Sequence, residues 1–81
     1  MSSTLYWLPI LPPDGTLSTA TKFWFRTMFG APVDIDLGEE QIPLLRAAIA
    51  ATPDEEIKKE LESLIEAVAS HGSIRVFEGG W

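Results

Sequence analysis

The chain contains no cysteine among its 81 residues. This absence excludes a disulfide scaffold, a thiolate metal site and a cysteine nucleophile together. His71 is the only histidine, and no Gly-x-Ser-x-Gly or similar motif supplies a nucleophile for it to activate. Next to Gly72, His71 is instead typical of a helix C-terminus. The six glycines are scattered or terminal and form no phosphate-binding loop. We therefore expect a protein that binds rather than one that catalyses.

Long hydrophobic runs are also missing. No apolar stretch approaches the roughly 20 residues that cross a bilayer. The first residues lack the basic and then apolar pattern of a signal peptide, so we expect a cytoplasmic protein without membrane contact. Hydrophobic residues make up 46% of the chain, which is typical of a globular protein of this size. We predict one domain over residues 1–81, with residues 79–81 as a flexible C-terminal end.

Positive charge is scarce, because 6 basic residues face 12 acidic ones and give a net charge of −6. Electrostatics of this sign repel nucleic acid phosphates and anionic lipids. Direct nucleic acid binding is therefore not expected. Two interpretations of the acidity remain: a surface that only confers solubility, or a surface directed at a basic protein partner.

The short apolar and aromatic run at residues 5–11 predicts a strand in its first half, and alternation of apolar with polar residues predicts strands over residues 33–36 and 73–78. Pro9 cannot donate to a sheet ladder, so the first strand should end there. The sequence Pro-Pro-Asp-Gly at residues 12–15 predicts a turn.

Residues 16–29 fit two structures. As a helix the segment is capped by Thr16 or Ser18, ends at Gly30 before Pro32, and places one apolar stripe toward the core: Leu17, Ala20, Phe23, Trp24 and Met28. As a strand, its Thr, Phe and Trp residues have high β propensity, and the preceding turn would make a hairpin. The stop signal favours the helix.

Two further helices follow. The first spans residues 38–51, with its regular part starting near residues 40–42 because of Pro43. The second begins at Thr52 as N-cap, with Pro53 at N1 and Glu55 at N3, and ends near Ser70 before Gly72. Both carry apolar stripes, formed by Ile42, Leu45, Ala48 and Ile49 and by Ile57, Leu61, Leu64, Ile65 and Val68. The order β-α-β-α-α-β predicts an α+β fold of two layers, with about three strands and an αα-hairpin packed on one face of the sheet.

Aromatic residues are numerous for a core of this size. On a helix, Phe25 and Phe29 lie off the main stripe beside Lys22 and Arg26. Both rings could pack under a neighbouring element, as is ordinary in a small core. Alternatively, together with Trp81, they form an exposed aromatic flank, since aromatic clusters rimmed by arginine mark protein interfaces. The flank could bind a protein partner or form a homodimer.

The last helix carries a polar stripe opposite its apolar face, formed by Glu55, Lys59, Glu62 and Glu66. Glu55 and Lys59 are spaced as a favourable i, i+4 pair. The three glutamates could contact a basic partner or face solvent only. A second acidic group comprises Asp34, Asp36, Glu39 and Glu40. It lacks the further ligands of a calcium loop, and helix capping explains it more simply.

The leading hypothesis is a small acidic interaction protein that binds and occludes or holds another macromolecule. Its most concrete form is an inhibitor of a nucleic-acid-binding host defence complex, of the kind that phages encode. The alternative is a self-associating accessory domain, and a metal-dependent enzyme is the least favoured. No cofactor is expected.

Overall fold

The computed structural model describes residues 3–10 and 14–80. These residues form four strands and three α-helices. In chain order they are β1 (Ser3–Leu8), β2 (Thr16–Leu17), α1 (Thr19–Phe29), β3 (Asp34–Gly38), α2 (Ile42–Ala51), α3 (Glu55–His71) and β4 (Ser73–Gly80), with a 3-10 turn at Glu39–Gln41 before α2. The predicted α+β fold is confirmed, with one strand more than expected, the short β2.

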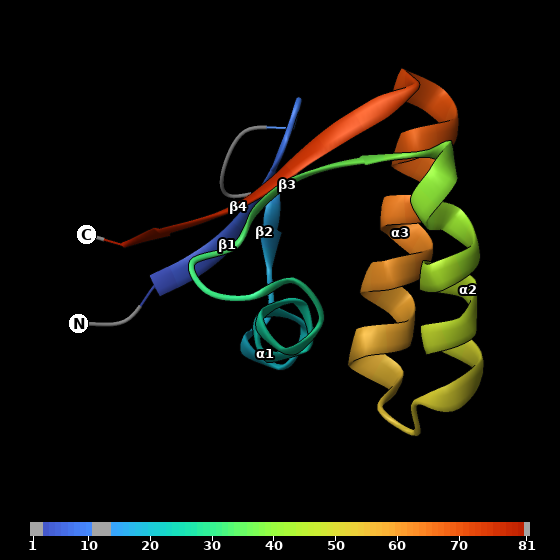
Figure 1. Cartoon of the computed structure of the whole chain (residues 1–81), viewed down its shortest axis with the longest axis horizontal. Coiled ribbons are helices and arrows are strands. Elements are labelled where there is room, and N and C mark those ends of the chain that lie inside the picture. Colours follow the sequence, from blue (N-terminus) through green and yellow to red (C-terminus); the bar gives the residue numbers. More distant parts are fainter. Residues whose placement is uncertain (1–2, 11–13, 81) are drawn as a thin grey trace.

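The sheet is antiparallel, with strand order β2-β1-β4-β3 in the part of the chain described (Figure 1). The last strand, β4, therefore lies between β1 and β3. Its register places Val76 between Trp7 and Ile35, and Glu78 opposite Leu5. Because directly opposed residues share a face of the sheet, Glu78 points to the same face as the buried Leu5.

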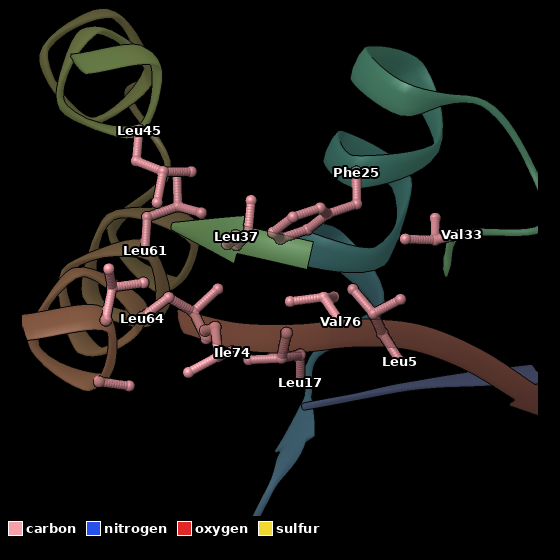
Figure 2. Packing of buried hydrophobic residues seen from close by; sticks show 12 residues of the cluster. Leu5, Leu17, Phe25, Val33, Leu37, Leu45, Leu61, Leu64, Ile74 and Val76 are labelled. Atoms are coloured by element: carbon pink, nitrogen blue, oxygen red, sulfur yellow. The ribbon is translucent and has the colours of Figure 1, made fainter. Parts of the chain in front are cut away.

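The core lies between this face of the sheet and the helices. Figure 2 shows side chains from β1, β3 and β4 converging with Phe25 of α1 and Leu61 of α3. The buried apolar cluster comprises Leu5, Leu17, Phe25, Val33, Leu37, Leu45, Leu61, Leu64, Ala67, Val68, Ile74 and Val76. Helices α2 and α3 form the predicted αα-hairpin, and α1 lies below the sheet in Figure 1, in contact with α3. The predicted inward faces of α2 and α3 are confirmed.

Residues 16–29 contain parts of both predicted structures. Thr16 and Leu17 pair with β1 as a short antiparallel strand, and the helix begins only at Thr19. Ser18 is its N-cap, with its hydroxyl accepting from the Thr21 amide, and Gly30 ends it with a φ of 86°. A positive φ of this size is accessible to glycine at little cost. The helix and its stop signal are therefore confirmed.

The predicted stripe of α1 is only partly correct, because Leu17 is buried and Trp24 packs against the core, but two other residues do not. Phe23 and Met28, expected in the core, are 54% and 45% exposed. Thr21, Lys22 and Phe25 are buried instead. Leu17 lies in β2, outside the helix, so its burial does not determine which face of α1 turns to the core.

The end of the chain also differs from expectation. Gly79 and Gly80 continue β4 and pair with Thr4 and Ser3, so the structure places them in the sheet rather than in a flexible end. Trp81 lies outside the described residues, as do Pro12 and Pro13 of the predicted turn.

The start of α3 corrects a predicted cap. Asp54, not Thr52, is the N-cap, since its carboxylate Oδ1 accepts from the amides of Glu56 (2.9 Å) and Ile57 (3.3 Å). The Thr52 hydroxyl accepts from the Asp54 amide at 3.2 Å, outside the helix. Pro53 therefore precedes the N-cap instead of occupying N1, and Glu55 is the first residue of the helix rather than N3.

We expect Asp54→Ala to lower the free energy of unfolding by about 1 kcal/mol, because two amides at the positive end of α3 lose their acceptor. Thr52→Ala should change it by less than about 0.5 kcal/mol, as for an ordinary surface substitution. Urea denaturation of the two variants measures both effects. A larger loss for Thr52→Ala than for Asp54→Ala would contradict the assignment.

Candidate functional site

The predicted aromatic flank of α1 does not exist as such. Phe25 is fully buried, and Phe29 is partly buried and stacks on it, with ring centroids 5.7 Å apart. Trp24 meets both rings edge-on. Phe25 is therefore a core residue, and the prediction that it emerges on an exposed flank is wrong. The fourth aromatic of the helix, Phe23, points outward instead.

The two basic residues of that flank serve internal contacts. Lys22 is only 8% exposed, and its ammonium donates to the carbonyl of Ser3 at 2.9 Å. Arg26 forms an ion pair with Glu78, with its Nε 3.1 Å from both carboxylate oxygens. Both side chains thus fasten α1 to the two central strands of the sheet. Neither offers its charge to a partner in this arrangement.

Glu78 is the acidic centre of this polar cluster. Its side chain is only 4% exposed, and it also accepts from the Ser3 hydroxyl and from the Val33 amide at 3.2 Å. The hydrogen bond from Arg26, followed by that from Ser3, lowers the pKa of Glu78 to about 2. An ionised carboxylate that accepts from the Arg26 guanidinium, the Ser3 hydroxyl and the Val33 amide is stable at this position. The cluster is structural, and only the alternation of β4 in the sequence hints at it.

A second carboxylate, Glu60 of α3, holds the start of α1. It accepts from the Ser18 amide at 3.1 Å, from the Ser18 hydroxyl at 2.7 Å, and from the hydroxyl of the buried Thr21. A negative charge at a helix N-terminus is favourable. Glu60 therefore links α1 to α3 and is not available to a partner.

Negative charge is concentrated on the helical hairpin. Eight of the twelve acidic residues and three of the six basic ones lie in residues 39–71, which gives this segment −5 of the net charge of −6. In the rest of the chain, Arg26 and Arg75 are paired with Glu78 and Asp34. The molecule thus has a nearly neutral sheet half and an acidic hairpin half.

A groove of about 450 Å³ runs between α2 and α3, lined by Arg46, Ile49, Ala50, Glu62, Ile65 and Glu66. We call it the α2–α3 groove. Ile49 and Ile65 are partly buried and pack against the core, so they form an apolar floor. Glu62 and Glu66 are exposed at one wall. Neither makes an ion pair or a hydrogen bond with any other described residue.

The structure thus brings two of the predicted site residues together. Glu62 and Glu66 share the groove. Glu55 lies at the start of α3, pairs with Lys58 at 3.5 Å, and lines a second, smaller hollow with Lys58, Lys59 and Glu62. The expected pair of Glu55 with Lys59 does not form. Sequence reasoning missed the α2 side of the groove, because Arg46 and Ile49 join it only through the packing of one helix on the other.

The open face of the sheet carries a different set of contacts. Arg75 binds Asp34 through two hydrogen bonds of 2.9 Å and lies 5.4 Å from the centre of the Phe77 ring. The hydrogen bond from Arg75 lowers the pKa of Asp34. Within residues 3–10 and 14–80, no three His, Asp or Glu side chains are grouped so that they could hold a metal ion. None of the helices described is long and apolar enough to span a membrane.

The described residues therefore define an antiparallel α+β fold whose helical hairpin presents an acidic groove with an apolar floor. Neither a protein-family model, nor a curated protein, nor a solved structure matches the chain.

Proposed function

We propose that this chain is a small acidic interaction protein of the cytosol that binds a basic surface of another protein and occludes it. The observation that carries the proposal is the concentration of five net negative charges on residues 39–71. Within that segment, Glu62 and Glu66 are exposed and have no partner among the described residues.

Such a distribution favours a directed interaction over general solubility. A surface that only confers solubility needs no separation of charge between the two halves of the molecule. Outside the hairpin segment, two of the four carboxylates, Glu78 and Asp34, pair with Arg26 and Arg75, whereas those of the groove wall have no such partner among the described residues. Exposed charge of one sign accelerates encounter with a surface of opposite sign.

The most concrete form of this function is inhibition of a nucleic-acid-binding complex, such as a host defence complex targeted by a phage protein. The lysines and arginines that bind phosphates are the groups that an acidic surface attracts. A protein that covers them would compete directly with nucleic acid. The hairpin carries the charge for this role.

A self-associating domain is the second candidate, and the exposed apolar residues of α1 favour it. Phe23 and Met28 are 54% and 45% exposed. A dimer would use this helix rather than the hairpin, because two hairpin segments of charge −5 repel each other. A solution mass equal to two chains would support this candidate.

Competition tests the proposed function. The partner protein is first captured with the immobilised chain from the cells in which the chain is expressed. The purified partner is then loaded with labelled nucleic acid, and free chain is added as competitor. We expect the wild type to release the nucleic acid and the double variant Glu62→Lys, Glu66→Lys to need at least about ten-fold more protein, since ten-fold corresponds to about 1.4 kcal/mol.

The matched control reverses two exposed aspartates outside the hairpin segment, Asp14→Lys with Asp36→Lys. It changes the net charge by the same amount and should keep the wild-type potency within about two-fold, because steering depends on local rather than total charge. Circular dichroism confirms that both variants are folded. Equal potency of the two double variants would assign the effect to net charge alone and contradict the role of the groove.

A further inference from the structure

We propose that the α2–α3 groove takes a basic amphipathic helix of the partner protein. This inference rests on the proposed function, since it specifies which element of a basic partner the acidic hairpin binds. It is carried by the shape of the groove, by its apolar floor and by the placement of charge on its two walls.

The shape of the groove follows from the helix repeat. Its lining residues are spaced i, i+3, i+4 on each helix, at 46, 49 and 50 and at 62, 65 and 66. Since α2 and α3 lie side by side as a hairpin (Figure 1), each set forms one side of a valley between the two helices, with Arg46 on the α2 side and Glu62 and Glu66 on the α3 side. A third helix can seat a row of side chains in such a valley, as in the helix-in-groove mode of peptide recognition.

The floor requires an apolar row on that helix. Ile49 and Ile65 are partly buried, and Ala50 is exposed and small enough to let another backbone approach. Covering these three side chains removes apolar surface from water, which is favourable. The ligand helix should therefore carry an apolar stripe of residues spaced i, i+3, i+4, i+7.

The walls define the flanks of the ligand. Glu62 and Glu66 lie one helical turn apart, with Cβ atoms about 5–6 Å from each other. Lysines or arginines at positions i and i+4 of a facing helix match this spacing. Arg46, on the opposite wall, disfavours basic residues on the second flank and favours an acidic one. The groove therefore selects a helix with basic residues on one flank only.

Other occupants fit less well. A strand places successive residues on opposite faces. Unlike a helix, it therefore cannot place an apolar row on the floor and an adjacent row of lysines against the wall. A second copy of the chain would bring a segment of charge −5 against the same charge. A basic helix satisfies floor and wall together.

Two synthetic peptides of identical composition test the inference. One folds as a helix with an apolar stripe, lysines at i and i+4 on one flank and a glutamate on the other; the second has the same residues in scrambled order. Binding of each to the full chain is measured by fluorescence anisotropy at low salt. We expect the ordered peptide to bind at least about ten-fold more tightly.

Variants of two alanines on α2 locate the site. Ala50 lines the groove, whereas Ala47 does not, and both are exposed. Ala50→Gln fills the floor with a larger residue that is still compatible with a helix. It should lower the affinity of the ordered peptide at least about five-fold. Ala47→Gln should leave its affinity unchanged. Equal affinities of these two variants would overturn the inference.

The two proposals fail in different ways. Equal binding of the ordered and scrambled peptides, both weakened by Glu62→Lys with Glu66→Lys, would overturn the helix and leave a basic partner in place. Absence of binding by either peptide would likewise overturn the helix as occupant. The proposed function is then decided by the competition experiment with the captured partner, which does not depend on the peptides.

Discussion

Phe25→Ala is expected to lower the free energy of unfolding by about 3–5 kcal/mol, the range for removing a buried phenylalanine. Phe25 is fully buried at the centre of the core (Figure 2) and contacts the rings of Trp24 and Phe29. Its removal leaves a cavity that the sheet beneath it cannot fill without moving. Domains of this size have a total stability of about 5–15 kcal/mol, so the variant should unfold at a much lower denaturant concentration.

Phe23→Ala is the matched control, because it makes the same change on the same helix. Phe23 is 54% exposed, so its loss should change the free energy of unfolding by no more than about 0.5 kcal/mol. Urea denaturation followed by circular dichroism measures both variants. Similar losses for the two would mean that the helix is turned differently from the arrangement in the structure.

Glu78→Gln is expected to have the second largest effect on stability, about 2 kcal/mol near neutral pH. A neutral amide replaces a nearly buried carboxylate that holds Arg26, the Ser3 hydroxyl and the Val33 amide. Hydrogen bonds to a charged group contribute about 1.5–3 kcal/mol. The loss should appear as a lower midpoint in urea, with the slope of the transition unchanged.

The same contact predicts a dependence of stability on pH. The pKa of Glu78 falls from 4.5 to about 2 on folding. A carboxyl with a lowered pKa in the folded state stabilises it above the unfolded pKa, and this stabilisation is lost as the pH falls toward the folded value. The difference in unfolding free energy between wild type and Glu78→Gln should therefore be constant above about pH 5 and shrink between pH 4.5 and 2. A difference that stays constant down to pH 2 would contradict the ionised pair.

The helical hairpin was predictable because its pattern is local. Leu45, Leu61 and Leu64 recur at helical spacing, and each is fully buried. Gly72 ends α3 with a φ of 83°, as its position in the sequence indicated. Hydrophobic spacing and helix-end residues act within a few residues of each other, so they can be read without knowledge of the fold.

The orientation of α1 was not predictable, because distant residues decide it. Thr21 and Lys22 look like surface residues, yet both are buried, since Glu60 accepts from the threonine and the Ser3 carbonyl accepts from the lysine. Glu60 lies 39 residues from Thr21 along the chain. A polar residue can be buried in a core when a hydrogen-bonding partner is present there. No local sequence pattern indicates a partner that is distant along the chain.

Only the α3 side of the candidate site was predictable from the sequence. The polar stripe of α3 identified Glu62 and Glu66 as exposed, because the opposite face of that helix is apolar. The groove itself needs Arg46 and Ile49 of α2, which face it only because the two helices pack against each other. A site formed by two elements depends on their packing, so one helix pattern shows only one wall of it.

The rate of association with the captured partner tests the central claim, that the free carboxylates of the hairpin attract a basic surface. The wild type should associate more slowly as salt is raised, because screening weakens attraction between exposed charges. Reversing Glu62 and Glu66 should lower the association rate at low salt by at least about ten-fold and flatten its dependence on salt, while the Asp14 and Asp36 control keeps both. Equal association rates for the wild type and the Glu62, Glu66 variant at low salt would contradict the account.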